Sequence, residues 1–327
     1  MKIVDALMTL GLAVVAGSLA PVPAMGQGPP TTSEYRYTIV DYPGSSSACL
    51  SINGRLDVIC DALFNQEFPF VYNARSGRIT LSTAAPPATW SAASFGINES
   101  GTVVGYVYPP DDSIENGFVV TKNGEYREFS VPWAAYTEAR GINNRGVITG
   151  TAFFDGPGSA GFIYDPEAGT YTEVLPSPYT ETMGITTDGH VVGTVYLDAG
   201  AGGPGAPAGQ YGYLRAANGS VTYFRVNGKD TYARGISDEG KIVGYFGALP
   251  IPQVTGFVTD VKELHSSKPP ATGFVVLAIP ARNQLQVPGA FGTLPQGIST
   301  EGTVSGAFID GSGKHTDSLP GRRTSVV

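Results

Sequence analysis

The chain has few side chains that carry charge or chemistry. Only 15% of its 327 residues are charged, and it contains three histidines and two cysteines. His190, His265 and His315 are far apart in sequence, and neither His-x-x-x-His nor His-Glu-x-x-His occurs, so a histidine zinc site has no support. Calcium loops of the Asp-x-Asp-x-Asp-Gly type and the Gly-x-Ser-x-Gly turn are also absent. We therefore expect no metal, no cofactor and no catalytic residue of a recognisable type.

Long helices and positive charge are missing as well. No segment after the N-terminus has a sustained apolar period of 3.6 residues, so no long helix is predicted. The net charge of −8 disfavours nucleic acid and anionic membranes as partners. Glycine and proline are abundant, with 44 and 25 copies, and there are 17 Tyr and 15 Phe. Turn-forming residues combined with aromatic residues are typical of short strands joined by tight turns, so we expect an all-β fold.

Residues 1–24 predict a secretory signal peptide. Lys2 is followed by an apolar stretch over residues 7–20, and small residues around Ala24 offer a cleavage site. The alternative is a membrane anchor, but the stretch is too short to cross a bilayer as a helix. Residues 25–34 have the composition of a flexible linker. We therefore expect a secreted or periplasmic protein.

The two cysteines predict a disulfide, because an even and close pair in an exported protein is usually oxidised. If Asn53 and Leu56 are the corners of a hairpin turn, Cys49 lies directly opposite Cys60. A shift of one residue would place them on opposite faces and prevent the bond. The other repeats described below have Gly where Leu56 stands, so we expect Leu56 to disfavour a bulged turn here.

The dominant feature of the sequence is a repeated turn that contains Gly-Ile-Asn. It occurs at 96–98 and 141–143, with related copies at 51–53, 184–186, 235–237 and 297–299. The starts of these copies are 45, 45, 43, 51 and 62 residues apart. A period of this size indicates one supersecondary unit that is repeated along the chain.

Each repeat predicts four short strands, which is the size of one propeller blade. The strand that follows the turn has a central glycine in five copies, and we expect crowding near a common axis to explain it: Gly105, Gly150, Gly193, Gly244 and Gly306. We predict a six-bladed β-propeller over residues 35–320, closed by the N-terminal strand at 35–40, with a disordered tail at 321–327. The alternative is an open solenoid with free ends.

These repeats resemble the bacterial extracellular HAF-repeat family, whose copies are close to Gly-Ile-Asn-x-x-Gly-x-Val-Val-Gly followed by a Gly-Phe strand. The matching segments are 96–105, 141–150, 184–193 and 235–244, and residues 41–44 (Asp-Tyr-Pro-Gly) resemble a related strand ending. The similarity covers about residues 35–312. The family's His-Ala-Phe triplet is replaced here by Gly-Phe or Gly-Tyr. The resemblance implies export and a propeller-like fold, and it implies no reaction.

The loops between the second and third strands vary most in length and are acidic, which makes them the predicted binding face. Their candidate binding residues are Asp111, Asp112, Glu115, Asp155 and Asp198. We expect a monomeric scaffold that binds a protein or a polysaccharide through these loops. The alternatives are an extracellular lyase or glycoside hydrolase with carboxylates at the propeller opening, and a structural surface protein without a ligand. Drift in the length of unconstrained loops would explain the same variation without any binding role.

Overall fold

The computed structural model describes residues 38–40, 46–63, 67–81, 91–109, 115–175, 177, 179–203, 205–247, 254–266, 274–287, 289–310 and 322–326. The predicted signal peptide (1–24) and linker (25–34) lie outside these residues. So do Asp111 and Asp112 of the predicted binding loops.

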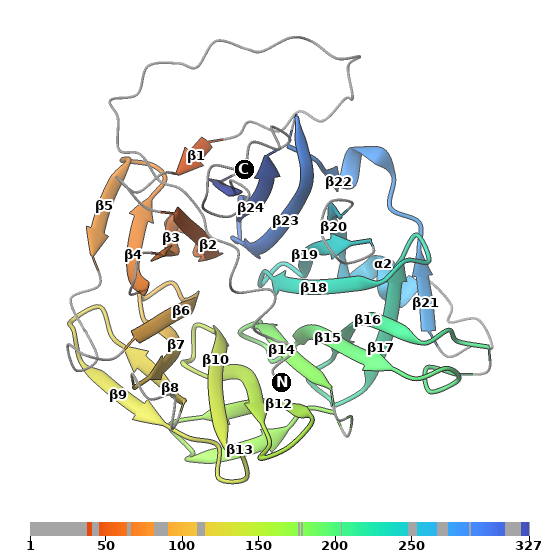
Figure 1. Cartoon of the computed structure of the whole chain (residues 1–327), viewed down its shortest axis with the longest axis horizontal. Coiled ribbons are helices and arrows are strands. Elements are labelled where there is room, and N and C mark those ends of the chain that lie inside the picture. The colour runs from red at the N-terminus through yellow and green to blue at the C-terminus, as the bar shows by residue number, and fades with distance from the viewer. Residues whose placement is uncertain are drawn as a thin grey trace.

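The described chain folds into a β-propeller, in which six sheets surround a common axis (Figure 1). Sheet 1 contains β2 (Ser46–Ile52), β3 (Asp57–Leu63), β4 (Glu67–Asn73) and β5 (Arg78–Leu81). Sheet 2 contains β6 (Ser91–Ile97), β7 (Val103–Tyr108), β8 (Asn116–Val120) and β9 (Tyr126–Phe129). Sheet 3 contains β10 (Tyr136–Ile142), β11 (Ile148–Phe153), β12 (Ser159–Asp165) and β13 (Thr170–Glu173).

The second half of the ring is less regular. Sheet 4 contains β14 (Thr180–Ile185), β15 (Val191–Leu197), β16 (Gly209–Arg215), β17 (Val221–Val226) and β21 (Phe274–Leu277). Sheet 5 contains β18 (Thr231–Ile236), β19 (Lys241–Phe246), β20 (Thr255–Asp260) and β22 (Gln284–Leu285). Sheet 6 contains β23 (Ala290–Ile298), β24 (Val304–Asp310), β25 (Arg322–Val326) and β1 (Thr38–Val40).

The prediction of six four-stranded blades is wrong, because only five of the sheets are four-stranded blades. Five sheets have four strands, and sheet 4 has five because β21 pairs in parallel with its outer strand β17. β21 belongs to an insertion between β20 and β22 that also contains the short helix α2 (Val261–Ser266) and the 3-10 turn η1 (Ala281–Asn283). This insertion explains the 62-residue spacing of the last repeat, and its Leu264 is buried in the core that sheets 4 and 5 share.

The first strand of each sheet lies nearest the axis and contacts the first strand of the next sheet. The first strand of sheet 1, β2, also contacts β23 of sheet 6. At this contact a side chain on Gly297 would approach the Cα of Ser51 to 2.8 Å. The sheets therefore form a ring, and the open row of repeats that was the alternative is excluded.

Sheet 6 is built from both ends of the described chain, because β1 pairs with β25 and β25 pairs with β24. The predicted disordered tail at 321–327 is therefore wrong for residues 322–326, which form a strand. Apolar side chains from facing sheets fill the space between them, so the core consists of clusters at sheet interfaces. No described helix is long and apolar enough to cross a membrane.

The disulfide prediction is confirmed, since Cys49 and Cys60 are bonded with an S–S distance of 1.94 Å and lie opposite each other in β2 and β3. The route to that register differs from the prediction. Leu56 adopts a left-handed backbone with φ of 62°, so the bulged turn forms despite the side chain. A second irregularity, between Cys49 and Ser51, shifts the register back by one residue. The two shifts cancel, and the cysteines face each other.

The central glycines have a different cause from the predicted crowding at the axis. The first strand has a bulge in every sheet, and the second-strand glycine lies opposite the residue before that bulge in five of them. A Cβ on Gly150 would overlap the carbonyl oxygen of Glu138 in the neighbouring strand and approach the ring of Phe162 to 2.8 Å. Backbone of the bulged strand blocks a side chain at all five glycines, and an aromatic ring of the third strand adds to this at Gly105, Gly150 and Gly193.

Candidate functional site

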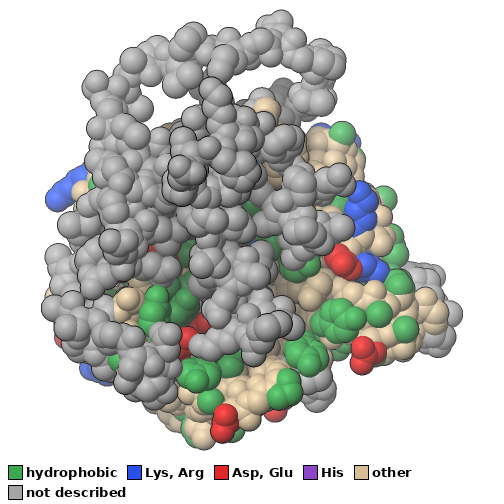
Figure 2. All heavy atoms as spheres, in the orientation of Figure 1, with side chains coloured by type: hydrophobic (Ala, Val, Ile, Leu, Met, Phe, Trp, Pro, Cys, Tyr) green, Lys and Arg blue, Asp and Glu red, His purple; other side chains and the backbone are tan. Residues whose placement is uncertain are grey.

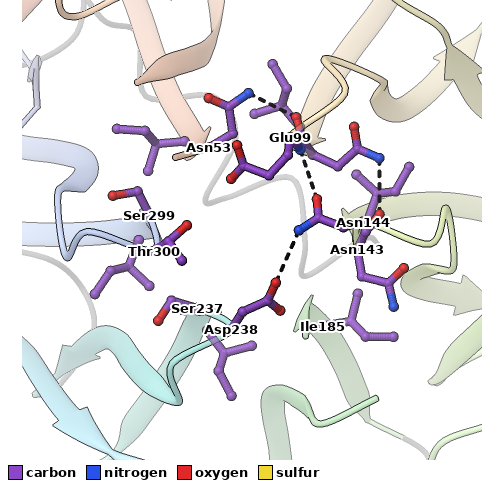
Figure 3. Close-up of a pocket in the computed structure, with 15 residues that line it drawn as sticks. Asn53, Glu99, Asn143, Asn144, Ile185, Ser237, Asp238, Ser299 and Thr300 are labelled. Atoms are coloured by element: carbon purple, nitrogen blue, oxygen red, sulfur yellow. Dashed lines mark hydrogen bonds between the residues drawn. The ribbon is translucent and has the colours of Figure 1, made fainter. Parts of the chain in front are cut away.

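The repeated turns meet at one end of the propeller, which we call the turn end, and surround a pocket on the axis (Figure 3). Each turn joins the first strand of a sheet to the second. The pocket has a volume of about 370 Å³ and is open to solvent. Its lining consists of Ile52, Asn53, Ile97, Asn98, Glu99, Ile142, Asn143, Asn144, Ile185, Ile236, Ser237, Asp238, Ile298, Ser299 and Thr300.

The asparagine of the motif performs two tasks at once. In sheet 3 the Oδ1 of Asn143 accepts the backbone N–H groups of Arg145 and Val147, both at 3.0 Å, which fixes its own turn. The Nδ2 of Asn143 donates to the carbonyl of Thr186 in the next sheet at 3.0 Å. An amide side chain has both a donor and an acceptor, so it can stabilise a turn and link two blades.

These links cover only half of the ring. Asn53 donates to the carbonyl of Asn98 at 2.9 Å, and Asn98 donates to that of Asn143 at 3.1 Å. Thr186, Ser237 and Ser299 replace the asparagine in the other three sheets. Their hydroxyls accept a backbone N–H of their own turn but donate to no backbone carbonyl of the next turn within the described chain. The sequence difference between Asn and Thr or Ser thus becomes a structural difference between the two halves.

Two carboxylates at the pocket rim also hold turns together. Glu99 accepts the backbone N–H of Gly54 at 2.6 Å. Asp238 accepts the backbone N–H of Thr187 at 2.6 Å and the side-chain amide of Asn144 at 3.1 Å (Figure 3). Among the described residues no group of three His, Cys, Asp or Glu side chains could hold a metal ion. These carboxylates therefore have a structural explanation.

Apolar side chains line the pocket beneath the polar rim. All six copies of the motif contribute an isoleucine, and these side chains retain only 4–9% exposure: Ile52, Ile97, Ile142, Ile185, Ile236 and Ile298. Such a ring gives no carboxylate or cation to a ligand on the axis. The three residues of the motif therefore have three structural roles. The glycine allows contact between first strands, the isoleucine contributes to the apolar ring, and the asparagine stabilises the turn.

A charged cluster lies on the first strands of sheets 3, 4 and 5, two to four residues before the isoleucine of each strand. Glu138 and Arg140 form a buried ion pair in β10, and the Arg140 guanidinium lies 4.1 Å from the ring centroid of Phe95. In the next two sheets Glu181 pairs with Arg234 at 3.4 Å, and Arg234 donates to the hydroxyl of Tyr245 at 2.7 Å. Solvent reaches this cluster, since the side chain of Glu181 is 30% exposed.

Burial raises the pKa of Glu138 to about 7. Arg140 opposes this rise, while the negative charges of Glu115 and Glu181 add to it. The coupling joins Glu138 and Glu181 in one electrostatic cluster although they belong to different sheets. The sequence carries one signal for it, because Arg precedes Gly-Ile in the copies at 141–143 and 235–237.

The described members of the predicted binding set, Glu115, Asp155 and Asp198, lie at the opposite end of the sheets, which we call the loop end, and none of these three lines the pocket. Glu115 is held close to β10, since its carbonyl accepts the N–H of Thr137 at 2.8 Å. Asp155 and Asp198 are exposed. Neither of these two carboxylates has a hydrogen bond or ion pair with a described residue, so no such contact joins them into one site. Their binding role stays a prediction.

Exposed aromatic side chains accompany these loops. Tyr179 and Tyr196 are 48% and 38% exposed, and their rings meet edge to face with centroids 6.4 Å apart. Tyr179 pairs with Ser159, directly after the Asp155 loop, and its carbonyl accepts the N–H of Tyr196 at 3.1 Å. Trp133, which is 42% exposed, precedes β10 on the other side of that loop. The sequence analysis did not identify these aromatic residues, because the alternation of apolar and polar residues along a strand does not distinguish a buried ring from an exposed one.

No protein-family profile and no curated protein matches the sequence. Solved structures share the fold at low identity. TolB from Acinetobacter baumannii is 9% identical over 73% of this chain, with a TM-score of 0.49, and this chain spans 53% of its length. The β-propeller domain of the Trilobed protease from Pyrococcus furiosus is 12% identical (81% of this chain, 79% of that chain, TM-score 0.46). The RRP9 WD40 repeats are 9% identical (90% and 98%, TM-score 0.47). Each is a likeness of fold alone.

Proposed function

We propose that this protein is a scaffold that binds a macromolecule, either a protein or a polysaccharide, through the loop end of its propeller. One observation carries the proposal. The exposed pair of Tyr179 and Tyr196 lies beside the Asp155 loop and just before Asp198, and these two carboxylates have no partner among the described residues. Exposed aromatic residues are costly in water and are enriched where proteins bind partners.

The turn end suits binding less well. Its amides and carboxylates bond to neighbouring turns, and isoleucines line the pocket below them. On the face shown in Figure 2, the described atoms carry isolated acidic and basic side chains among apolar and uncharged ones, without a large area of one charge.

The proposal includes export to the periplasm or the medium and membership of the HAF-repeat family. The disulfide supports export, because such bonds persist in oxidising compartments. We further propose that the signal is cleaved before the linker at 25–34, and that β1 closes the ring by pairing with β25. N-terminal sequencing of the protein recovered from the medium or the periplasm tests the cleavage, and intact residues 1–24 would contradict it.

A binding array of glycans and immobilised proteins tests the main proposal. We expect a reproducible ligand that is lost in the Tyr179→Ala/Tyr196→Ala variant and retained in Val276→Ala. Val276 is the matched control, because it is the fourth exposed large apolar side chain of the described residues and lies on β21, at the outer edge of sheet 4. Equal binding by the wild type and the tyrosine variant would refute the loop end as the binding surface.

One observation favours the alternative function, an extracellular lyase or glycoside hydrolase. A carboxyl with a pKa of about 7 can act as a general acid near neutral pH, and Glu138 is coupled to Glu181, which solvent reaches. In such an enzyme Glu138 would donate the proton and Glu181 would act as the second carboxylate. Release of reducing ends or unsaturated products from polysaccharides, abolished by both Glu138→Gln and Glu181→Gln, would support this alternative over a pure scaffold.

A further inference from the structure

Around Tyr179 and Tyr196 the loop end has acidic side chains but no basic ones, and this charge indicates which kind of partner fits. The described segments around Tyr179 and Tyr196 are residues 153–159, 177, 179–181 and 194–203, and they contain no lysine, arginine or histidine. They do contain Asp155 and Asp198, which have no partner among the described residues, and Glu181, which pairs with Arg234 of sheet 5. The whole chain has a net charge of −8, so no compensating charge comes from the rest of the molecule on balance.

Both acidic loops are positioned beside the tyrosines by backbone contacts. Ser159, which ends the Asp155 loop, pairs with Tyr179. Asp198 directly follows the last residue of β15, two residues after Tyr196, and both side chains are exposed while Leu197 between them is buried. Each exposed ring therefore has an exposed carboxylate close to it in the chain or across a bridge.

We infer that the partner of the loop end is a basic protein segment, and this inference rests on the proposed function above. Lysine or arginine side chains of the segment lie over the faces of Tyr179 and Tyr196, where the ring quadrupole attracts a cation. Asp155 and Asp198 accept their N–H groups in charge-assisted hydrogen bonds. A neutral glycan would use the rings but would leave two carboxylates without a counter-charge, and an acidic ligand would be repelled.

Synthetic peptides and a sugar test this inference with the full chain. The three fluorescent probes are a peptide of alternating Lys and Gly-Ser, the same peptide with Glu in place of Lys, and a neutral linear glucan oligosaccharide. Fluorescence anisotropy measures the affinity of each probe at low and high salt. We expect the lysine peptide to bind, the glutamate peptide not to bind, and the affinity for the lysine peptide to fall as salt increases.

Two paired variants locate the contact. We expect Tyr179→Ala/Tyr196→Ala to weaken binding of the lysine peptide by about tenfold. We expect Asp155→Asn/Asp198→Asn to weaken it by about fivefold and to reduce its salt dependence. Val276→Ala controls for loss of an exposed apolar side chain. Glu301→Gln controls for loss of an exposed charge, since Glu301 lies in the repeated turn of sheet 6 at the other end.

The outcomes separate this inference from the proposed function. If the glucan binds through the tyrosines and the lysine peptide does not, the scaffold proposal stands and the basic partner is refuted. If the lysine peptide binds equally well to all variants, attraction to overall charge explains it, and the inference is refuted. If the wild type binds none of the probes, the basic partner is likewise refuted, and the array described above then decides the scaffold proposal independently.

Discussion

Replacement of Glu138 by glutamine tests whether the buried pair in β10 destabilises the propeller at neutral pH. The ordinary pKa of this carboxyl is 4.5, and the fold raises it to about 7, mainly through burial. The folded state therefore holds this proton more tightly than the unfolded state does. The stability linked to the proton is fully present below pH 4.5 and is lost as the pH rises through about 7.

Each pKa unit corresponds to about 1.4 kcal/mol, so the rise from 4.5 to about 7 corresponds to about 3 kcal/mol. Glutamine resembles the protonated carboxyl and does not titrate. We expect the free energy of unfolding of Glu138→Gln to exceed that of the wild type increasingly between pH 4.5 and pH 8, with the difference growing by about 3 kcal/mol. Groups that titrate in both proteins cancel in this comparison.

Urea unfolding followed by tryptophan fluorescence at a series of pH values measures the difference. Glu301→Gln is the control, because its side chain is exposed and should leave the pH profile unchanged. Parallel curves for the wild type and Glu138→Gln across this range would refute the reasoning. They would mean that Arg140 keeps Glu138 ionised throughout, so that the ion pair outweighs the cost of burial.

Three further predictions concern the scaffold, and denaturant unfolding measures all of them. Asn143→Ser keeps the acceptor for its own turn but removes the donor to Thr186, so we expect a loss of about 1–2 kcal/mol. Asn218→Ser, in an exposed turn where the asparagine accepts only from Ser220, should cost less than about 0.5 kcal/mol, and equal effects would contradict the link between blades. Gly150→Ala should cost about 3 kcal/mol or more because its Cβ meets a carbonyl of the adjacent strand. Gly124→Ala, with open space but φ of 86°, should cost about 1 kcal/mol, and a reversed order would exclude the steric explanation. Cys49→Ala/Cys60→Ala should cost about 3 kcal/mol, the loop entropy expected for a separation of 11 residues, and an unchanged midpoint would show that the disulfide adds nothing to the core around it.

The features that could be predicted from the sequence are those that local sequence patterns determine. The period of the Gly-Ile-Asn turns indicated the propeller, and the close pair of cysteines indicated the disulfide, although the turn between them is bulged where no bulge was expected. Long-range features were not predictable. The pairing of β21 with β17 joins residues about fifty positions apart through a parallel contact that leaves no periodic signal. The left-handed Leu56 opposes its own propensity, because the surrounding repeat determines the turn.

The candidate site was harder to predict for the same reason. The acidic loops were visible as variation in length, but exposure of Tyr179 and Tyr196 depends on packing between sheets. The raised pKa of Glu138 depends on burial and on Glu115 and Glu181, which come from other segments. The burial of a side chain and the charged groups around it depend on how the sheets pack in the folded ring, so the sequence alone did not reveal them.

The additional strand β21 has a consequence for how the ring comes apart. Thr186 makes no amide link toward sheet 5, yet β21 leaves sheet 5 and completes the edge of sheet 4. This segment of the chain thus joins sheets 4 and 5, where no asparagine side chain donates a hydrogen bond to the next turn. Hydrogen exchange should therefore show sheets 4 and 5 opening in a single cooperative event.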